Sequence, residues 1–80
     1  MKIAEIRSYI EKEILRDPAA QIEPDQDLLL SGSLDSLGIV RLVEYLESRS
    51  GVQIPAQDVT LENFGSLQKI AAYIASRQGD

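Results

Sequence analysis

The sequence predicts an all-α fold, a small four-helix bundle with three longer helices and one short helix, in a single domain over residues 1–80. Apolar residues recur at helical spacing in three separate stretches, with turn-forming residues between them. No alternating apolar and polar run indicates a β-strand. Because the chain has 80 residues and no cysteine, helix packing must supply the stability of one modest core.

The first helix is predicted over residues 2–16, where four isoleucines share one face between charged residues. These isoleucines are Ile3, Ile6, Ile10 and Ile14. Asp17-Pro18 should end this helix. Residues 17–35 then form a long irregular segment, which we expect Ile22 and the run Leu28 to Leu30 to anchor in the core.

The second helix is predicted from Ser36 to about Ser50, with Asp35 as its N-cap and Gly51 just past its end. At about 100° per residue, one face collects apolar side chains and the opposite face turns to solvent. The inward face holds Ile39, Leu42, Val43 and Leu46. The outward face holds Leu37, Arg41, Glu44 and Ser48, with Glu47 at its margin. Gly38 should leave a smooth surface beside Leu37.

Two further helices are predicted after an extended Ile54-Pro55 loop. Thr60 caps a short helix that Gly65 ends, and Ser66 caps a last helix to about Arg77. Leu67, Ile70, Ala71 and Ile74 should face the core from the last helix.

Composition limits the possible functions. Thirteen acidic against eight basic residues give a net charge of −5, which disfavours nucleic acid as a partner. No apolar stretch is long enough for a signal peptide or a membrane span, so we expect a cytoplasmic monomer with no membrane insertion. With no histidine and no cysteine, the chain has no imidazole base, no thiolate nucleophile and no ordinary zinc site, so we expect no catalytic residue, no metal site and no enzyme activity.

The segment from Asp27 to Leu37 carries a recognisable motif. Asp27-Leu28, Gly32 and Leu34-Asp35-Ser36-Leu37, followed by an amphipathic helix, resemble the acyl carrier protein family and its peptidyl, aminoacyl and D-alanyl carrier relatives. The resemblance extends over nearly the whole chain, including the Ile-Pro loop and the short third helix. It implies a four-helix bundle of the acyl-carrier type.

The resemblance also implies the site. Ser36 would receive 4′-phosphopantetheine from coenzyme A, with Asp35 and Leu37 completing the attachment motif. A serine at the first helical position is open to a modifying enzyme, and a helix N-terminus favours the anionic phosphodiester. The neighbouring Asp35 opposes that anion by charge repulsion.

Partners follow from the same resemblance. They would be a phosphopantetheinyl transferase, an acyl- or aminoacyl-loading ligase and downstream acyl-processing enzymes. We expect these partners to contact Leu37, and on the outward face Arg41, Glu44, Glu47 and Ser48. The mixed charge of that face differs from the more uniformly acidic face of fatty-acid-type carriers, which suggests a specialised partner set.

The cargo remains open at this point. The chain is predicted to carry acyl intermediates as thioesters in fatty acid, polyketide or specialised lipid biosynthesis. An aminoacyl, peptidyl or D-alanyl carrier is the alternative, favoured by Asn63-Phe64-Gly65 before the last helix. From another class, an unmodified helical interaction module would explain an exposed Leu37 but not the placement of Asp35-Ser36.

Overall fold

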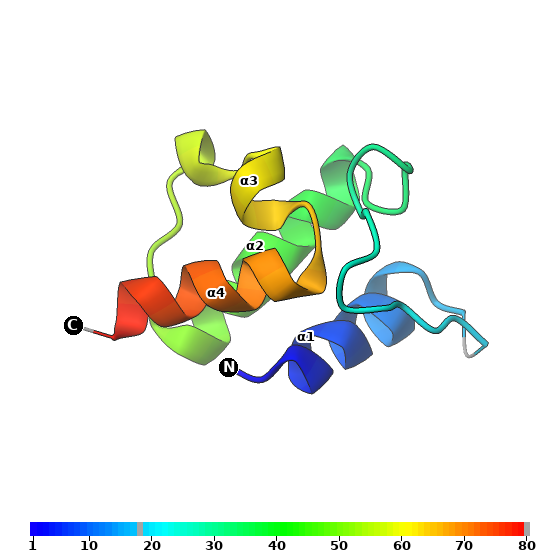
Figure 1. The fold of residues 1–80 in the computed structure, drawn as a ribbon, viewed down its shortest axis with the longest axis horizontal. Helices are drawn as coiled ribbons and strands as arrows, with labels where there is room; N and C mark the ends of the chain where they lie inside the picture. The colour runs from blue at the N-terminus through cyan, green and yellow to red at the C-terminus, as the bar shows by residue number, and fades with distance from the viewer. Residues whose placement is uncertain (18, 80) are drawn as a thin grey trace.

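The computed structural model describes residues 1–17 and 19–79, and over these residues it is helical with no β-strand. The elements in chain order are α1 (Ile3–Tyr9), the π-helix η1 (Ile10–Ile14), α2 (Ser36–Ser50), the 3₁₀-helix η2 (Ala56–Asp58), α3 (Leu61–Phe64) and α4 (Leu67–Gln78) (Figure 1). The first helix with its π-helical end, α2 and α4 are the three longer helices, and α3 is the short one. The predicted all-α bundle is therefore confirmed.

The first helix differs from its prediction at its end. Helical structure stops at Ile14 and not at residue 16, and the last five residues are a π-helix. Arg16 then adopts a left-handed backbone with φ 53°, so the helix ends before Asp17. The predicted stop at Asp17-Pro18 involves Pro18, which lies outside the described residues.

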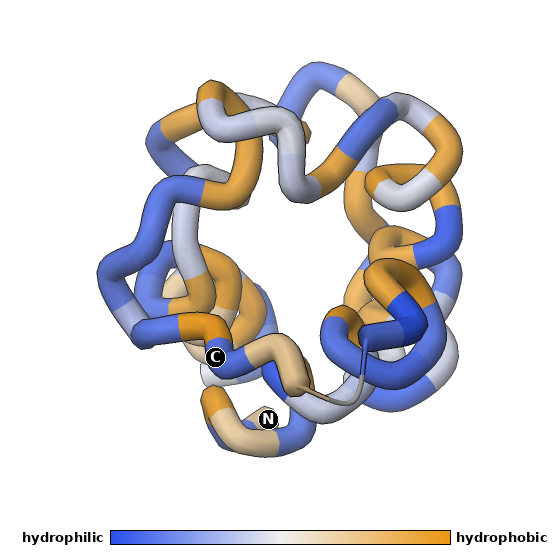
Figure 2. The backbone as a smooth tube through the Cα atoms, turned by 90° about the vertical axis from the view of Figure 1, so that its right-hand side faces the viewer, coloured by the Kyte–Doolittle hydropathy of each residue, from blue (hydrophilic) through white to orange (hydrophobic). Residues whose placement is uncertain are grey.

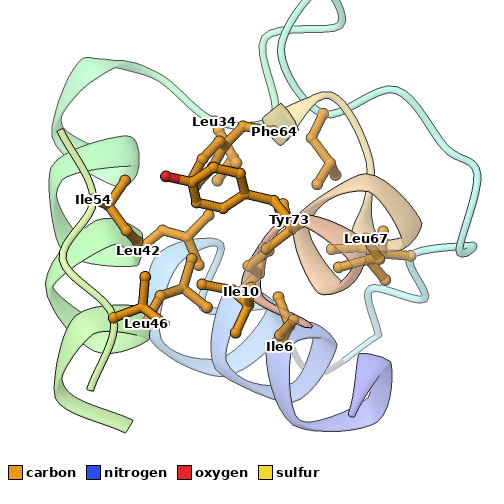
Figure 3. Packing of buried hydrophobic residues seen from close by; sticks show 14 residues of the cluster. Ile6, Ile10, Leu34, Leu42, Leu46, Ile54, Phe64, Leu67 and Tyr73 are labelled. Atoms are coloured by element: carbon orange, nitrogen blue, oxygen red, sulfur yellow. The ribbon is translucent and has the colours of Figure 1, made fainter. Parts of the chain in front are cut away.

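The core lies where α4 packs against α1, α2 and α3 (Figures 1 and 3). Hydrophobic and hydrophilic residues alternate along the helical turns (Figure 2), and the three longer helices bury apolar side chains in a common core. The core side chains with no exposed surface are Ile6, Ile10, Leu28, Leu42, Leu46, Phe64, Leu67, Ile70 and Ile74. Each longer helix contributes at least two of them, so no helix can bury its apolar face without the others.

The segment between η1 and α2 is irregular but firmly attached. The Leu28 N–H donates to the Gly65 carbonyl at 2.8 Å, and the Gln68 N–H donates to the Pro24 carbonyl at 3.0 Å. Ile22 and Leu28 are buried, as predicted. Leu30 corrects the prediction, because its side chain is 79% exposed and anchors nothing. Asp27 turns the chain outward there by accepting the N–H groups of the two residues before Ser31.

Every predicted N-cap serves its helix. The Thr60 hydroxyl accepts the Asn63 N–H and the Ser66 hydroxyl accepts the Lys69 N–H, each at 3.3 Å. Gly51 ends α2 with a left-handed φ of 77°. Within residues 1–17 and 19–79, no helix is both long and apolar enough to cross a membrane.

The 3₁₀-helix η2 was not predicted, and a buried tyrosine holds it in place. The Tyr73 hydroxyl on α4 donates to Asp58 Oδ2 at 2.6 Å, and Arg77 lies 3.7 Å from the same oxygen. The Asn63 amide donates to the Asp58 carbonyl at 3.0 Å. Asp58 therefore joins η2, α3 and α4, three elements that the sequence separates by loops.

Replacing Tyr73 with phenylalanine should destabilise the protein. The change removes the hydroxyl that Asp58 accepts and keeps the ring that packs 5.5 Å from the ring of Phe64. Loss of one hydrogen bond to a charged acceptor should lower the free energy of unfolding by about 1–2 kcal/mol. Urea denaturation followed by circular dichroism measures it. Tyr45→Phe is the matched control, because the Tyr45 hydroxyl makes no hydrogen bond among the described residues, and an equal loss in both variants would contradict the assignment.

The same contact predicts a dependence on alkaline pH. Burial, followed by the Asp58 carboxylate, raises the pKa of Tyr73 above its ordinary value of 10.0. A raised folded-state pKa means that this stabilisation is complete below pH 10 and is lost as the pH rises through the folded value. The difference in unfolding free energy between wild type and Tyr73→Phe should therefore be constant from pH 7 to 9 and shrink above pH 10. Unchanged separation of the two curves up to pH 11 would refute this assignment.

Candidate functional site

The candidate site lies at the N-terminus of α2, where Ser36 is the first helical residue. Its side chain is exposed, and its hydroxyl makes no hydrogen bond among the described residues. A first-turn position also leaves nearby backbone N–H groups without intrahelical acceptors. The arrangement thus offers an accessible hydroxyl beside a partial positive charge.

Asp35 fixes the start of the helix. Its backbone is extended, with φ −87° and ψ −177°, and its Oδ1 accepts the Gly38 N–H at 2.8 Å. Its carbonyl accepts the Ile39 N–H at 2.9 Å, which is the first intrahelical bond. Asp35 therefore serves as the N-cap that the sequence predicts, with one carboxylate oxygen committed to the backbone.

The residues around Ser36 divide sharply between core and solvent. Leu34, two positions before it, is buried with 3% of its surface exposed, while Leu37 is 63% exposed. Val40, one turn later on the helix, is 53% exposed. The chain is therefore anchored just before the serine and presents apolar side chains just after it.

Gly38 corrects a prediction. The sequence suggested a smooth exposed surface at this position, but Gly38 is buried. A Cβ added there would lie 3.1 Å from Ile14 Cγ2 and 3.3 Å from Asp35 Oδ1. The glycine is thus the point at which the end of η1 approaches the first turn of α2, and a side chain would push against both neighbours.

The outward face of α2 has the predicted members, with one difference in environment. Leu37, Arg41, Glu44 and Ser48 are all exposed, whereas Glu47 is half-buried. A Glu47 carboxylate oxygen accepts the Ile54 N–H at 2.9 Å, which ties the loop after α2 to the helix. The ion pairs within the described residues join Arg49 to Glu5 and Arg77 to Asp58, so Arg41 and Glu44 do not form the pair that their i, i+3 spacing allows.

A surface pocket next to this face was not predicted. It has a volume of about 300 Å³ and is lined by Ile14, Arg16, Asp35, Leu37, Gly38 and Arg41. The exposed Val40 is another residue near Ser36 that the prediction missed, although helical spacing in the sequence could have placed it there. The sequence held no signal for Arg16, because this residue precedes the serine by 20 positions and an irregular segment lies between them.

Comparison with protein families identifies this arrangement. The profile of the family described as "PP-binding: Phosphopantetheine attachment site" matches residues 4–74. A D-alanyl carrier protein of Streptococcus suis (strain 05ZYH33) is 34% identical over 65 residues, or 81% of this chain and 80% of that protein. Its counterpart in strain 98HAH33 is 41% identical over 46 residues, which span just over half of each protein, 58%.

Two solved structures share the fold. A chain in a structure described as "Crystal structure of FAD-dependent dehydrogenase" superposes with a TM-score of 0.79 and 30% identity, over 86% of this protein and 97% of that chain. A chain from the Bradyrhizobium japonicum glycine:[carrier protein] ligase complexed with glycylated carrier protein gives a TM-score of 0.66 and 28% identity, over 89% and 90%.

The residues present fit the prosthetic group that this family carries. The hydroxyl of Ser36 is exposed and unbonded among the described residues, and the first turn of α2 supplies N–H groups suited to a phosphodiester. Family membership removes the alternative of an unmodified interaction module, because the whole fold and the motif occur together. The chain therefore belongs to the phosphopantetheine attachment family, as a carrier protein whose prosthetic group is a covalently bound phosphopantetheine.

Proposed function

We propose that this protein is a non-catalytic carrier that holds an amino acid as a thioester on a 4′-phosphopantetheine arm attached to Ser36. The observation that carries the proposal is the exposed, unbonded hydroxyl at the first residue of α2, within a fold that belongs to carrier proteins. The terminal thiol of the arm supplies the acyl-bearing group that the cysteine-free chain lacks.

Attachment uses the geometry of the first turn. The Ser36 oxygen forms a bond to the pyrophosphate phosphorus of coenzyme A that bears the pantetheine. The pyrophosphate P–O bond breaks, adenosine 3′,5′-bisphosphate leaves, and a base takes the hydroxyl proton. We propose that the transferase supplies that base, since the chain has no histidine and the neighbouring Asp35 uses one carboxylate oxygen to cap α2. The protein contributes position: Leu34 anchors the chain below the serine, and Asp35 sets the helix start.

The choice of an amino acid rests on the relatives. The outward face of α2 already separates this chain from carriers with a uniformly acidic face, because it holds Arg41 as well as Glu44 and Ser48. Two relatives are D-alanyl carrier proteins, and one solved neighbour is a carrier protein bearing glycine. These similarities favour the aminoacyl alternative over the fatty acid and polyketide functions that the sequence first suggested.

The proposed partner surface is the outward face of α2. Leu37 is the apolar contact beside the serine, with Arg41, Glu44 and Ser48 along the same face. Exposing a leucine at 63% gives no folding benefit, whereas burying it against a partner is favourable. Glu47 would act at the margin of this surface, where one of its carboxylate oxygens already holds Ile54. The partners we propose are a transferase, an aminoacyl-loading ligase and downstream enzymes.

We also propose that one of those downstream enzymes is a flavin-dependent dehydrogenase. The observation behind it is the superposition of this protein on 97% of a chain in a structure described as an FAD-dependent dehydrogenase. A carrier in that setting would present its thioester for oxidation, and tethering would keep the cargo at a high effective concentration near the flavin.

Ser36 should be the single site of modification. After incubation with coenzyme A, magnesium and a promiscuous phosphopantetheinyl transferase, the wild-type protein should gain the mass of one phosphopantetheine group. Ser36→Ala should gain nothing, because the accepting oxygen is absent. Ser76→Ala, which removes an exposed serine hydroxyl on α4 outside the proposed partner surface, is the matched control and should be modified like wild type. A modified Ser36→Ala variant, or an unmodified wild type, would overturn the assignment.

The cargo should be an amino acid. Protein isolated under mild acid from the organism that encodes it should show, by intact-mass spectrometry, the holo form plus the residue mass of an amino acid. Hydroxylamine should release that addition, because it cleaves thioesters, and Ser36→Ala should lack it. Long-chain acyl masses released in the same way would return the function to fatty acid or polyketide carriage.

A further inference from the structure

The pocket beside the candidate attachment site has an unusual charge for this protein. Two of its six lining residues are arginines, Arg16 and Arg41, although the chain carries a net charge of −5. The remaining charged lining residue is Asp35, whose Oδ1 is occupied by the Gly38 N–H. The pocket therefore holds more positive than negative charge, beside the two residues that flank Ser36.

Neither guanidinium makes an ion pair or a hydrogen bond among the residues that the structure describes. Among the described residues, the ion pairs and side-chain hydrogen bonds of arginine involve Arg49 and Arg77, and the side chains of Arg16 and Arg41 make none. Arg41 enters the hydrogen-bond network only through its backbone carbonyl, which accepts the Tyr9 hydroxyl at 3.3 Å. Two arginines thus line one pocket without a described carboxylate partner.

The backbone brings these two arginines together from distant parts of the chain. Side chains on a helix lean toward its N-terminus, so Arg41 extends back over the first turn of α2, toward Leu37 and Gly38. Arg16 approaches from the other side, because η1 ends against Gly38 and the chain then turns through a left-handed residue. The buried glycine is what lets η1 come this close.

We propose that Arg16 and Arg41 form an anion pocket for the phosphodiester of the arm, an inference that rests on the proposed attachment at Ser36. Ser36 is not itself a lining residue, but the pocket borders Asp35 and Leu37 on either side of it. The two long arginine side chains would extend from the pocket to a phosphodiester on Ser36. Guanidinium groups bind phosphate oxygens through paired N–H donors, and the open N–H groups of the helix start add to them.

The positive charge of the pocket also offsets an electrostatic repulsion within the attachment motif. Asp35 is required as the cap of α2, yet its carboxylate repels a phosphodiester on the next residue. Two arginines in the same pocket offset this repulsion without disturbing the cap. The arm would then leave the protein with its phosphate end held against the α1 side of α2 while the thiol end stays free to reach partner enzymes.

Nuclear magnetic resonance of the holo protein tests this pocket directly. The Nε–Hε resonances of Arg16 and Arg41 should shift when the apo protein is converted to the holo form, and that of Arg49 should not. In holo Arg16→Gln/Arg41→Gln the ³¹P resonance of the arm should move relative to wild type. Arg49→Gln, a matched charge removal elsewhere on α2, should leave it in place. Lysine at both positions should recover part of the wild-type ³¹P shift, because the charge returns without the paired donors.

Salt supplies a second readout. The ³¹P difference between wild type and the double variant should fall strongly from 0.1 M to 1 M salt, because the Debye length drops from about 10 Å to about 3 Å. Unmoved arginine resonances in a protein that has gained the full arm mass would overturn the anion pocket alone. A protein that gains no mass would overturn the proposed function and this inference with it. An unchanged ³¹P spectrum combined with slower aminoacylation would show that the arginines serve a partner's carboxylate, and the proposal would be wrong.

Discussion

The hydrogen bond from the Gly38 N–H to Asp35 Oδ1, at 2.8 Å, is the constraint on which the site depends. It fixes the residue at which α2 begins, and an N-cap of this kind stabilises a helix by about 1 kcal/mol. Starting the helix one residue later would make Ser36 the N-cap, and its hydroxyl would then turn toward backbone N–H groups of the helix instead of standing free. Leu34, just before the helix, and Leu42, on its inward face, are both buried, and they fix the rotation of α2 about its axis. The position of the Ser36 hydroxyl is therefore set by the backbone and its neighbours, because the Ser36 side chain makes no hydrogen bond among the described residues.

A second constraint connects this turn to the first helix. The space around Gly38 admits no side chain without displacing Ile14 or the cap, because both lie within 3.3 Å of an added Cβ. Close contact here brings the end of η1, and Arg16 beyond it, to the edge of the site. The π-helical turn and the left-handed residue at this end of the first helix are irregularities of a kind that gathers near functional sites. One glycine thus determines both the packing of the first helix and the charge beside the serine.

Local rules predicted most of the fold, and contacts between distant residues account for what they missed. Each N-cap at Asp35, Thr60 and Ser66 could be read from the sequence, because capping depends on a few neighbouring residues. The burial of Gly38 and the exposure of Leu30 could not, since they depend on what packs across from them. The contact between Asp58 and Tyr73 spans 15 residues and left no periodic signal. At the site, Asp35, Ser36 and Leu37 came from a motif, whereas the approach of Arg16 came only from the fold.

Charge acts on this carrier at two distances, and the two effects need not have the same sign. The net charge of −5 is felt by approaching proteins over about a Debye length and favours partners with basic surfaces. In the apo protein the arginines of the pocket beside Asp35 and Leu37 reverse that sign locally, while Glu44 restores it one turn farther along α2. A basic partner that matched only the overall charge would therefore meet repulsion at this pocket before the arm is attached. Discrimination of this sort arises from a locally unfavourable contact for the wrong enzyme, and it requires no change in the core that this protein shares with other carriers.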